Sequence, residues 1–287
     1  MASLKEVKGR IASVNSTRKI TSAMKMVASA KLHKAQAAIE SMLPYERRLH
    51  HILTDFMSNC TEVTSPFIVK REVKKVAVVV FASNTSLCGG FNANVIRHLV
   101  DLLAEYKPLG LENILVFPVG KKVADAVRKL GFRIEGDFQH MADKPSYQEA
   151  ADLAADLMKR FLHGDVDKVE LLYNHFKSTA SQILTRETYL PIDLNNEKNE
   201  EERTIDYILE PSAEELMQEM LPKVLRMKMF TVLLDSNAAE HAARTMAMQI
   251  ATDNANELLQ ELTVMYNKSR QQSITNELLD IVGGSMA

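Results

Sequence analysis

The feature that most constrains the fold is a stretch of about 60 residues, Lys223 to Val282, that contains neither glycine nor proline. These are the two residues that most reliably break a helix. At ~1.5 Å per residue, a helix of this length measures about 90 Å. No compact domain built by this chain is that wide, so the helix must protrude. Apolar and small residues recur along it at steps of four and three, the spacing of a helix face that packs on a partner helix: Leu225, Met229, Val232, Ser236, Ala239, Ala243, Met246 and Ile250.

A second long helix is predicted over residues 2–58. Its apolar positions also advance by threes and fours, from Leu4 to Phe56. Pro44 is expected to kink this helix or to end its tightly packed portion. We expect the two terminal helices to leave the rest of the protein side by side and antiparallel, so that each covers the apolar stripe of the other. Small residues at 236–243 would let the two axes approach closely.

Between these helices the pattern is that of an α/β domain. Val76 to Phe81 is a continuous apolar run, typical of a strand buried on both faces. Alternation of strands and helices predicts a Rossmann-like domain with a mostly parallel sheet, covered on both faces. The further predicted strands are 113–119, a short one within 132–138, 168–176 and 183–191, and the helices are 92–106, 121–130 and 146–163.

The predicted fold class is therefore α/β: a long antiparallel two-helix coiled coil plus this central domain. A domain of this size is roughly 40 Å across, about half the length of either terminal helix. We assign residues 1–60 and 211–287 to the coiled coil, 70–195 to the globular head and 196–210 to a linker and foot.

The net charge of the chain excludes few partners, but its two cysteines indicate a reducing compartment. The net charge of -2 identifies no class of partner. Cys60 and Cys88 lack CxxC spacing and are read as free thiols in a reducing compartment. The N-terminus has no apolar signal core, and no window approaches the ~20 apolar residues of a membrane span. We expect a cytosolic chain without a removed targeting segment.

The loop at 83–92, after the first buried strand, is the best position for an active site in such a fold. Neither GxGxxG nor GxxxxGK[ST] occurs there or elsewhere in the chain, so a structural turn at Gly89 and Gly90 is favoured. Cys88 would need a positioned base to act as a nucleophile, and His98 is only a possible helical neighbour. No His, Cys or carboxylate cluster has metal-ligand spacing. The residues alone predict no active site, no metal and no cofactor.

The segment 266–275 has eight polar residues in ten on one continuous helix. The simple interpretation is an exposed face. However, Arg270, Gln271 and Thr275 offer directional hydrogen bonds, as a protein-binding surface would. Nothing later in the chain can cover the apolar tip, which indicates a partner; the tip is formed by Ile274, Leu278, Ile281 and Val282.

Basic residues dominate the first 39 positions, with Glu6 as the one acid. They form either a solvated helix face or a strip that meets an acidic partner protein or nucleic acid. The strip consists of Lys5, Lys8, Arg10, Arg18, Lys19, Lys25, Lys31 and Lys34.

Three motifs resemble the γ subunit family of F-type ATP synthases, of bacterial type. They are Lys-Ile-Thr-Ser-Ala-Met-Lys-Met-Val-Ala at 19–28, Leu-Cys-Gly-Gly at 87–90, and Tyr-Asn-Lys, Arg-Gln and Ser-Ile-Thr within 266–275. The resemblance runs from end to end. It implies a non-catalytic central rotor shaft inside a ring of three α and three β subunits, with the catalytic sites on β. Ion-driven rotation of a membrane c-ring would drive ATP synthesis. In the opposite direction, ATP hydrolysis would rotate the c-ring and pump ions.

The resemblance also implies partners and roles for single residues. The head would lie against the ε subunit and the c-ring, on the cytoplasmic side of the bacterial inner membrane, with no direct membrane or nucleic-acid contact and no cofactor. The implied contacts with β are Met24, Arg244, Arg270, Gln271 and Thr275; the implied bearing is the apolar tip, and the implied foot on the c-ring is Asp206, Tyr207 and Ile208.

One departure from the family concerns the loop before Leu-Cys-Gly-Gly. Members often have Asp-Arg-Gly where this chain has Asn84-Thr85-Ser86, so any ion pair made by that Asp or Arg is absent.

Two other functions remain open on the residues. The first is a nucleotide-binding α/β enzyme with a coiled-coil dimerisation arm, which predicts saturable nucleotide binding by the isolated chain. The second is a coiled-coil nucleic-acid binder that uses the basic strip and predicts salt-sensitive DNA binding. The near-neutral charge and the lack of interleaved aromatic residues count against the second.

Overall fold

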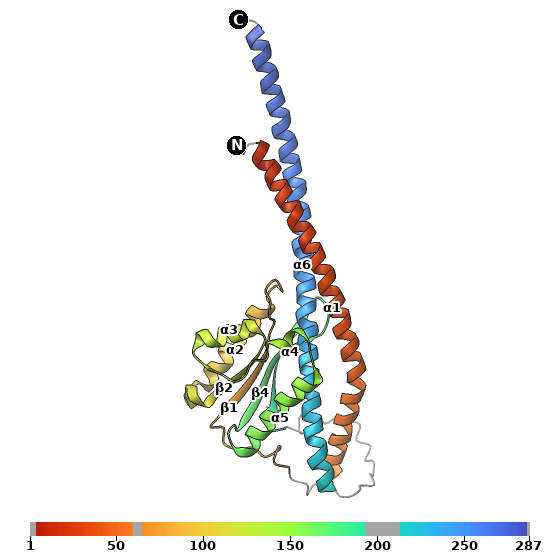
Figure 1. Cartoon of the computed structure of the whole chain (residues 1–287), viewed down its shortest axis with the longest axis vertical. Coiled ribbons are helices and arrows are strands. Elements are labelled where there is room, and N and C mark those ends of the chain that lie inside the picture. The colour runs from red at the N-terminus through yellow and green to blue at the C-terminus, as the bar shows by residue number, and fades with distance from the viewer. Residues whose placement is uncertain (1–3, 60–64, 193–212, 286–287) are drawn as a thin grey trace.

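Two long antiparallel helices dominate the computed structural model, which describes residues 4–59, 65–192 and 213–285 (Figure 1). Helix α1 spans Leu4–Asn59 and continues through Pro44, and α6 spans Ala213–Ser285 and continues through Pro222. They lie side by side with both chain ends at the same end of the rod, and α6 extends past the start of α1. The predicted two-helix coiled coil is confirmed.

The head is a five-stranded sheet in the order β3-β2-β1-β4-β5. Its strands are β1 (Val76–Phe81), β2 (Ile114–Val119), β3 (Arg133–Ile134), β4 (Lys168–Phe176) and β5 (Gln182–Leu190). β1 is central and fully buried, because it pairs in parallel with both β2 and β4. Only the β4–β5 pair is antiparallel. The mostly parallel sheet is confirmed, and the strand predicted within 132–138 is two residues long.

Helices cover both faces of the sheet. On one face, α2 (Phe91–Tyr106) and α3 (Lys121–Leu130) pack on alternate residues of β1 such as Val78. Two short 3-10 turns, η1 (Lys107–Leu109) and η2 (Leu111–Asn113), connect α2 to β2. The other face, which includes Val79, packs on α4 (Gln139–Asp143), α5 (Tyr147–His163) and α6. The long helix is thus part of the core of the head (Figure 1).

Small side chains bring α1 and α6 together. Leu32 and Ala35 of α1 pack on Ala238 and Ala242 of α6, and Ala238 is fully buried. Further along the rod, the hydroxyls of Thr21 and Thr252 lie 2.8 Å apart and share a hydrogen bond. Alanine at the contact leaves no bulk between the two backbones, so the helices approach closely, as the sequence predicts.

Where α6 passes between α1 and the head, it buries polar as well as apolar residues. Burial, together with the positive charges of Arg244 and Lys31, lowers the pKa of His241 to about 4, with Asp143 opposing the shift. Burial raises the pKa of Glu240, against the opposing effect of Arg244. The buried polar group on this part of α6 comprises Ser236, Asn237, Glu240, His241, Arg244 and Thr245.

We predict that Ala238→Leu destabilises the protein by about 1–3 kcal/mol, because a larger side chain at a close-packed contact forces the helices apart. Ala23→Leu, on an exposed position of α1, is the matched control and should change the free energy of unfolding by less than about 0.5 kcal/mol. Urea unfolding followed by far-UV circular dichroism measures both. Equal stability of the two variants would contradict the close packing.

We predict that acid lowers the free energy of unfolding because of His241, whose pKa is lowered in the folded state. The unfolded state, with a pKa near 6.5, binds the proton more readily than the folded state, so stability falls as the pH drops below about 6.5. Between pH 7 and pH 5, wild type should lose about 2 kcal/mol more than His241→Asn does. Glu240 is present in both chains, so its opposite contribution largely cancels.

The control for this measurement is His98→Asn, at an exposed position of α2. Urea unfolding at each pH should give His98→Asn the same pH dependence as wild type. A His241→Asn chain that loses as much stability as wild type would show that His241 is not held neutral.

Candidate functional site

The described residues hold no group of three or more His, Cys, Asp or Glu side chains that could bind a metal ion. Within the same part of the chain, no helix is both long and apolar enough to cross a membrane.

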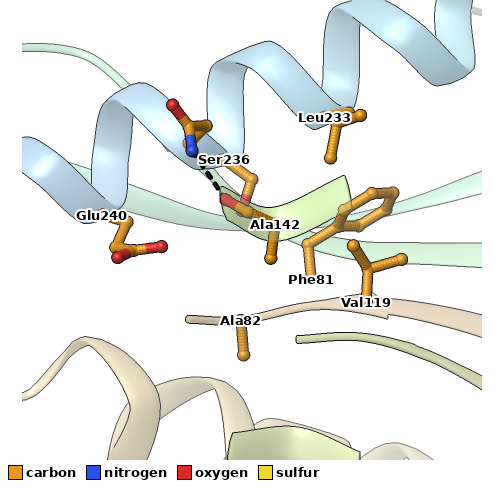
Figure 2. A pocket seen from close by; sticks show the side chains of 8 residues that line it. Phe81, Ala82, Val119, Ala142, Leu233, Ser236 and Glu240 are labelled. Atoms are coloured by element: carbon orange, nitrogen blue, oxygen red, sulfur yellow. Dashed lines mark hydrogen bonds between the residues drawn. The ribbon is translucent and has the colours of Figure 1, made fainter. Parts of the chain in front are cut away.

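The crevice at the carboxyl ends of the strands, where doubly wound sheets bind ligands, is filled by α6 (Figure 2). Leu233, Ser236 and Glu240 of α6 face Phe81 and Val119 at the ends of β1 and β2. The remaining cavity is about 10 Å³, which holds at most one water. Asn237 also lines this space, and its Nδ2 donates to the carbonyl oxygen of Ala142 at 2.9 Å, the dashed line in Figure 2. A nucleotide has no room here.

The loop after β1 is held by hydrogen bonds within the loop and to the starts of α3 and α4. Asn92 Oδ1 accepts from the backbone N–H of Ser83 at 3.1 Å. Asn84 Nδ2 donates to the carbonyl oxygen of Gln139 at 2.8 Å, and its Oδ1 accepts from the backbone N–H of Lys121. Gly89 has φ +60°, the left-handed region that favours glycine. This arrangement supports the structural turn expected from the sequence.

A shallow groove of about 230 Å³ lies between this turn and α6. Gly90 and Asn94 line its head side, and Met246 and Ile250 line its α6 side.

The guanidinium group of Arg244 joins α6 to the loop after β1. Its Nη1 donates to Glu240 Oε1 at 2.5 Å, and its Nη2 donates to Thr85 Oγ1 at 2.9 Å. The residue is only 9% exposed. Thr85, one of the three residues at which the sequence differs from the expected Asp-Arg-Gly, thus supplies a neutral acceptor for a buried arginine. The predicted contact of Arg244 with a β subunit stays a prediction.

A second polar contact joins α6 to the end of β4. Asp235 Oδ1 accepts from the backbone N–H of Phe176 at 2.8 Å, and Asp235 Oδ2 lies 2.7 Å from His175 Nδ1. Sequence reasoning missed both this contact and the Arg244–Thr85 contact. The one local signal was the group of polar and charged residues, including Asp235 and Arg244, on an alanine-rich part of the helix that was expected to pack closely.

The N-terminal helix presents the basic strip outward. Met24, within the Lys-Ile-Thr motif, is half-buried beside this strip. Arg10 pairs with Glu6 at 2.8 Å, and Arg18 donates to Asn256 Oδ1 of α6 at 3.3 Å. Six members of the strip are exposed, namely Lys5, Lys8, Arg10, Lys19, Lys31 and Lys34, and Arg18 and Lys25 are half-buried.

The C-terminal motif lies where α6 leaves the coiled coil. The Thr21–Thr252 pair sets an antiparallel register that places Leu4, the start of α1, near residue 269. Residues from Arg270 onward therefore project beyond the described part of α1 (Figure 1). Arg270, Gln271 and Thr275 are exposed, and Thr275 Oγ1 donates to the carbonyl oxygen of Gln271 at 2.9 Å.

All four residues of the predicted apolar tip are exposed. Their exposed fractions range from 48% for Ile274 to 69% for Ile281, with Leu278 and Val282 between them. The structure thus brings the tip together with the polar motif on one projecting end. The predicted foot, Asp206, Tyr207 and Ile208, lies outside the described residues, as does the whole predicted linker.

Comparison with solved structures shows the same fold. A chain of the Euglena gracilis mitochondrial ATP synthase has a TM-score of 0.67 and 22% identity, with 99% of this chain and 93% of that chain covered. A chain of the Tetrahymena thermophila mitochondrial ATP synthase central stalk and c-ring has a TM-score of 0.58 and 21% identity, with 81% of this chain and 99% of that chain covered.

Comparison of sequences is more specific. The family model described as ATP synthase matches residues 3–287. The chain is 81% identical to the ATP synthase gamma chain of Phocaeicola vulgatus and 65% identical to that of Bacteroides fragilis, in each case over the full length of both chains. The projecting rod, the α/β head mounted on it and the three motifs thus occur in a chain that belongs to the ATP synthase gamma chain family.

Proposed function

We propose that this protein is the central rotor shaft of an F-type ATP synthase, and that it couples ion-driven rotation of the membrane c-ring to ATP synthesis or hydrolysis. The observation that carries the proposal is the end of α6, where a polar motif and an apolar tip project together beyond the coiled coil. Such an end needs a surrounding partner, because an exposed apolar surface of this kind is otherwise costly in water.

The shaft itself is proposed to be non-catalytic, with the catalytic sites on the β subunits. In support, α6 fills the crevice at the carboxyl ends of β1 and β2. The same observation counts against the alternative of a nucleotide-binding enzyme with a dimerisation arm, because the ligand site of such a fold would lie in that crevice.

The proposed assembly places the rod within three α and three β subunits and the head against ε and the c-ring. In the proposed division, residues 1–60 and 211–287 form the rod, 70–195 the head, and 196–210 the linker and foot. Asp206, Tyr207 and Ile208 would rest on the c-ring. The complex would hold the protein at the cytoplasmic side of the bacterial inner membrane, without a direct membrane contact, a cofactor or nucleic acid.

The roles of single residues follow from where they project. Arg270, Gln271 and Thr275 would make directional hydrogen bonds with β that break and re-form in each cycle, while the apolar tip turns in a weakly specific bearing. Met24 and the basic strip would face an acidic segment of β. Arg244 would contact β with the small part of its side chain that stays exposed, while Glu240 balances its charge.

One asymmetric shaft can set three catalytic sites to different affinities, because each β subunit meets a different side of it. A shaft changes the population of β conformations only by contacting one of them more favourably than another. The single projecting end of α6 supplies such an asymmetric surface.

Purification of the tagged protein from its native membrane tests the proposal directly. We expect α, β, ε and c subunits to co-purify in a complex that hydrolyses ATP. Recovery of the chain without these subunits, together with saturable ATP binding by the isolated chain, would support the enzyme alternative instead.

Arg270→Ala and Gln271→Ala should each lower ATP turnover of the assembled complex by roughly 5- to 10-fold, the effect of losing one hydrogen bond of about 1–1.5 kcal/mol. Thermal unfolding of the isolated subunit should not change, because both side chains are exposed. Gln272→Ala is the matched control: it is adjacent and exposed but not part of the motif. If both motif variants assemble and turn over ATP at the wild-type rate, these contacts are wrongly assigned.

Met24→Lys should lower the number of ions pumped per ATP hydrolysed, because it adds a charge at the contact proposed between α1 and β. Met26→Lys adds the same charge two residues away, about 200° around the helix, and should pump as wild type does. Proton or sodium uptake by inverted vesicles, divided by ATP hydrolysis, gives the ratio. An unchanged ratio in Met24→Lys removes Met24 from the proposed contacts.

A further inference from the structure

Where α6 leaves the head, polar contacts join the two on two sides of the helix, in addition to the Asn237–Ala142 hydrogen bond in the crevice and the Lys228–Glu187 ion pair nearer the start of α6. On one side, Asp235 binds the end of β4 through the backbone N–H of Phe176 and the ring of His175. On the other side, Arg244 binds Thr85 in the loop after β1. We call these contacts the Asp235 anchor and the Arg244–Thr85 anchor.

The two anchors lie on opposite sides of the helix axis. An α-helix turns about 100° per residue, so nine residues separate two side chains by about 180°. Between the anchors, Ala239 and Ala243 pack on Cys88, Phe91 and Phe176 of the head. The head therefore holds about half the circumference of α6, with an apolar seat in the middle and a directional contact at each edge.

Nearer the start of α6, bulky side chains such as Leu225, Met229 and Phe230 pack into the core of the head. At the level of the anchors the apolar seat is formed by Ala239 and Ala243, whose small side chains offer no ridge that would lock into the head. Hydrogen bonds, in contrast, weaken steeply when donor and acceptor are misaligned. Both anchors are largely shielded from water: the side chain of Asp235 is 15% exposed and that of Arg244 is 11% exposed.

The Arg244–Thr85 anchor is electrostatically complete within the chain. The positive charge of Arg244 is balanced by Glu240, one turn earlier on the same helix, at 2.5 Å. Thr85 therefore needs to supply only a neutral acceptor. A charge-assisted hydrogen bond of this kind is stronger than a neutral one.

We propose that Asp235 and Thr85 are positioning residues that fix the rotational register of α6 in the head, so that torque passes between head and rod without slip. The proposal rests on the rotor function proposed above. It adds that, where α6 leaves the head, its register is set by two directional contacts on opposite sides of the helix, beyond the apolar core and the other polar contacts nearer its start.

The test is the double variant Asp235→Ala/Thr85→Val in the complete complex, reconstituted in vesicles. Thr85→Val keeps the shape of the side chain and removes the hydroxyl. We expect ATP hydrolysis by the detached, unloaded catalytic sector to match wild type, because little torque crosses the joint. Ions pumped per ATP by the vesicles should fall about twofold or more, because part of each rotation is lost at the joint.

A merely structural role would give a different result, in which hydrolysis and pumping fall together and their ratio stays constant. The matched control is Thr85→Ser/Asp253→Ala, which keeps the hydroxyl and removes an exposed aspartate whose partner is Gln249 on the same helix. This control should pump as wild type does.

A double variant that pumps as many ions per ATP as wild type would overturn the proposal. If the double variant fails to assemble, Thr85→Val and Asp235→Asn are measured singly, and a wild-type ratio in both overturns it as well. A wild-type complex that does not pump would instead refute the rotor function, so the two failures are distinguishable.

Discussion

The close packing of α1 on α6 is the contact on which the rest of the structure depends. Most helical stability in proteins comes from tertiary packing of an apolar face, since helix propensity alone is weak. Leu32 and Ala35 on one side and Ala238 and Ala242 on the other supply that packing, and the Thr21–Thr252 pair continues it toward the projecting end. The pairing places Leu4, the start of α1, near residue 269 of α6. It therefore also decides which part of α6 extends beyond α1 and can meet another protein.

The head uses α6 as one of its own core elements, and this has two consequences. Leu233, Asn237 and Glu240 occupy the space that a ligand would need, so the α/β fold is present without its usual binding crevice. The same insertion buries His241, Glu240 and Arg244 on a helix that elsewhere is exposed on one side. The α/β domain thus holds the long helix α6 in the place where related folds bind a ligand.

Much of the fold and of the candidate site could be predicted because their signals are local. The run Val76 to Phe81 identified the central strand, and the three-and-four spacing identified both long helices. Exposure of Arg270 and Gln271 could be anticipated because polar residues dominate the helix at 266–275. The anchors could not, because Thr85 and Arg244 are 159 residues apart and Phe176 and Asp235 are 59 apart. Contacts between residues so far apart leave no periodic pattern in the sequence.

The sequence by itself determined the length of the rod, the alternation of strands and helices in the head and membership of the family, since these depend on periodicity and on motifs of consecutive residues. Tertiary structure alone decided the antiparallel direction of β5, the filling of the crevice by α6 and the partner of Thr85. Each of these is a choice between distant segments that compete for the same contacts, and it is settled by which arrangement buries the most apolar surface while leaving each buried charge paired.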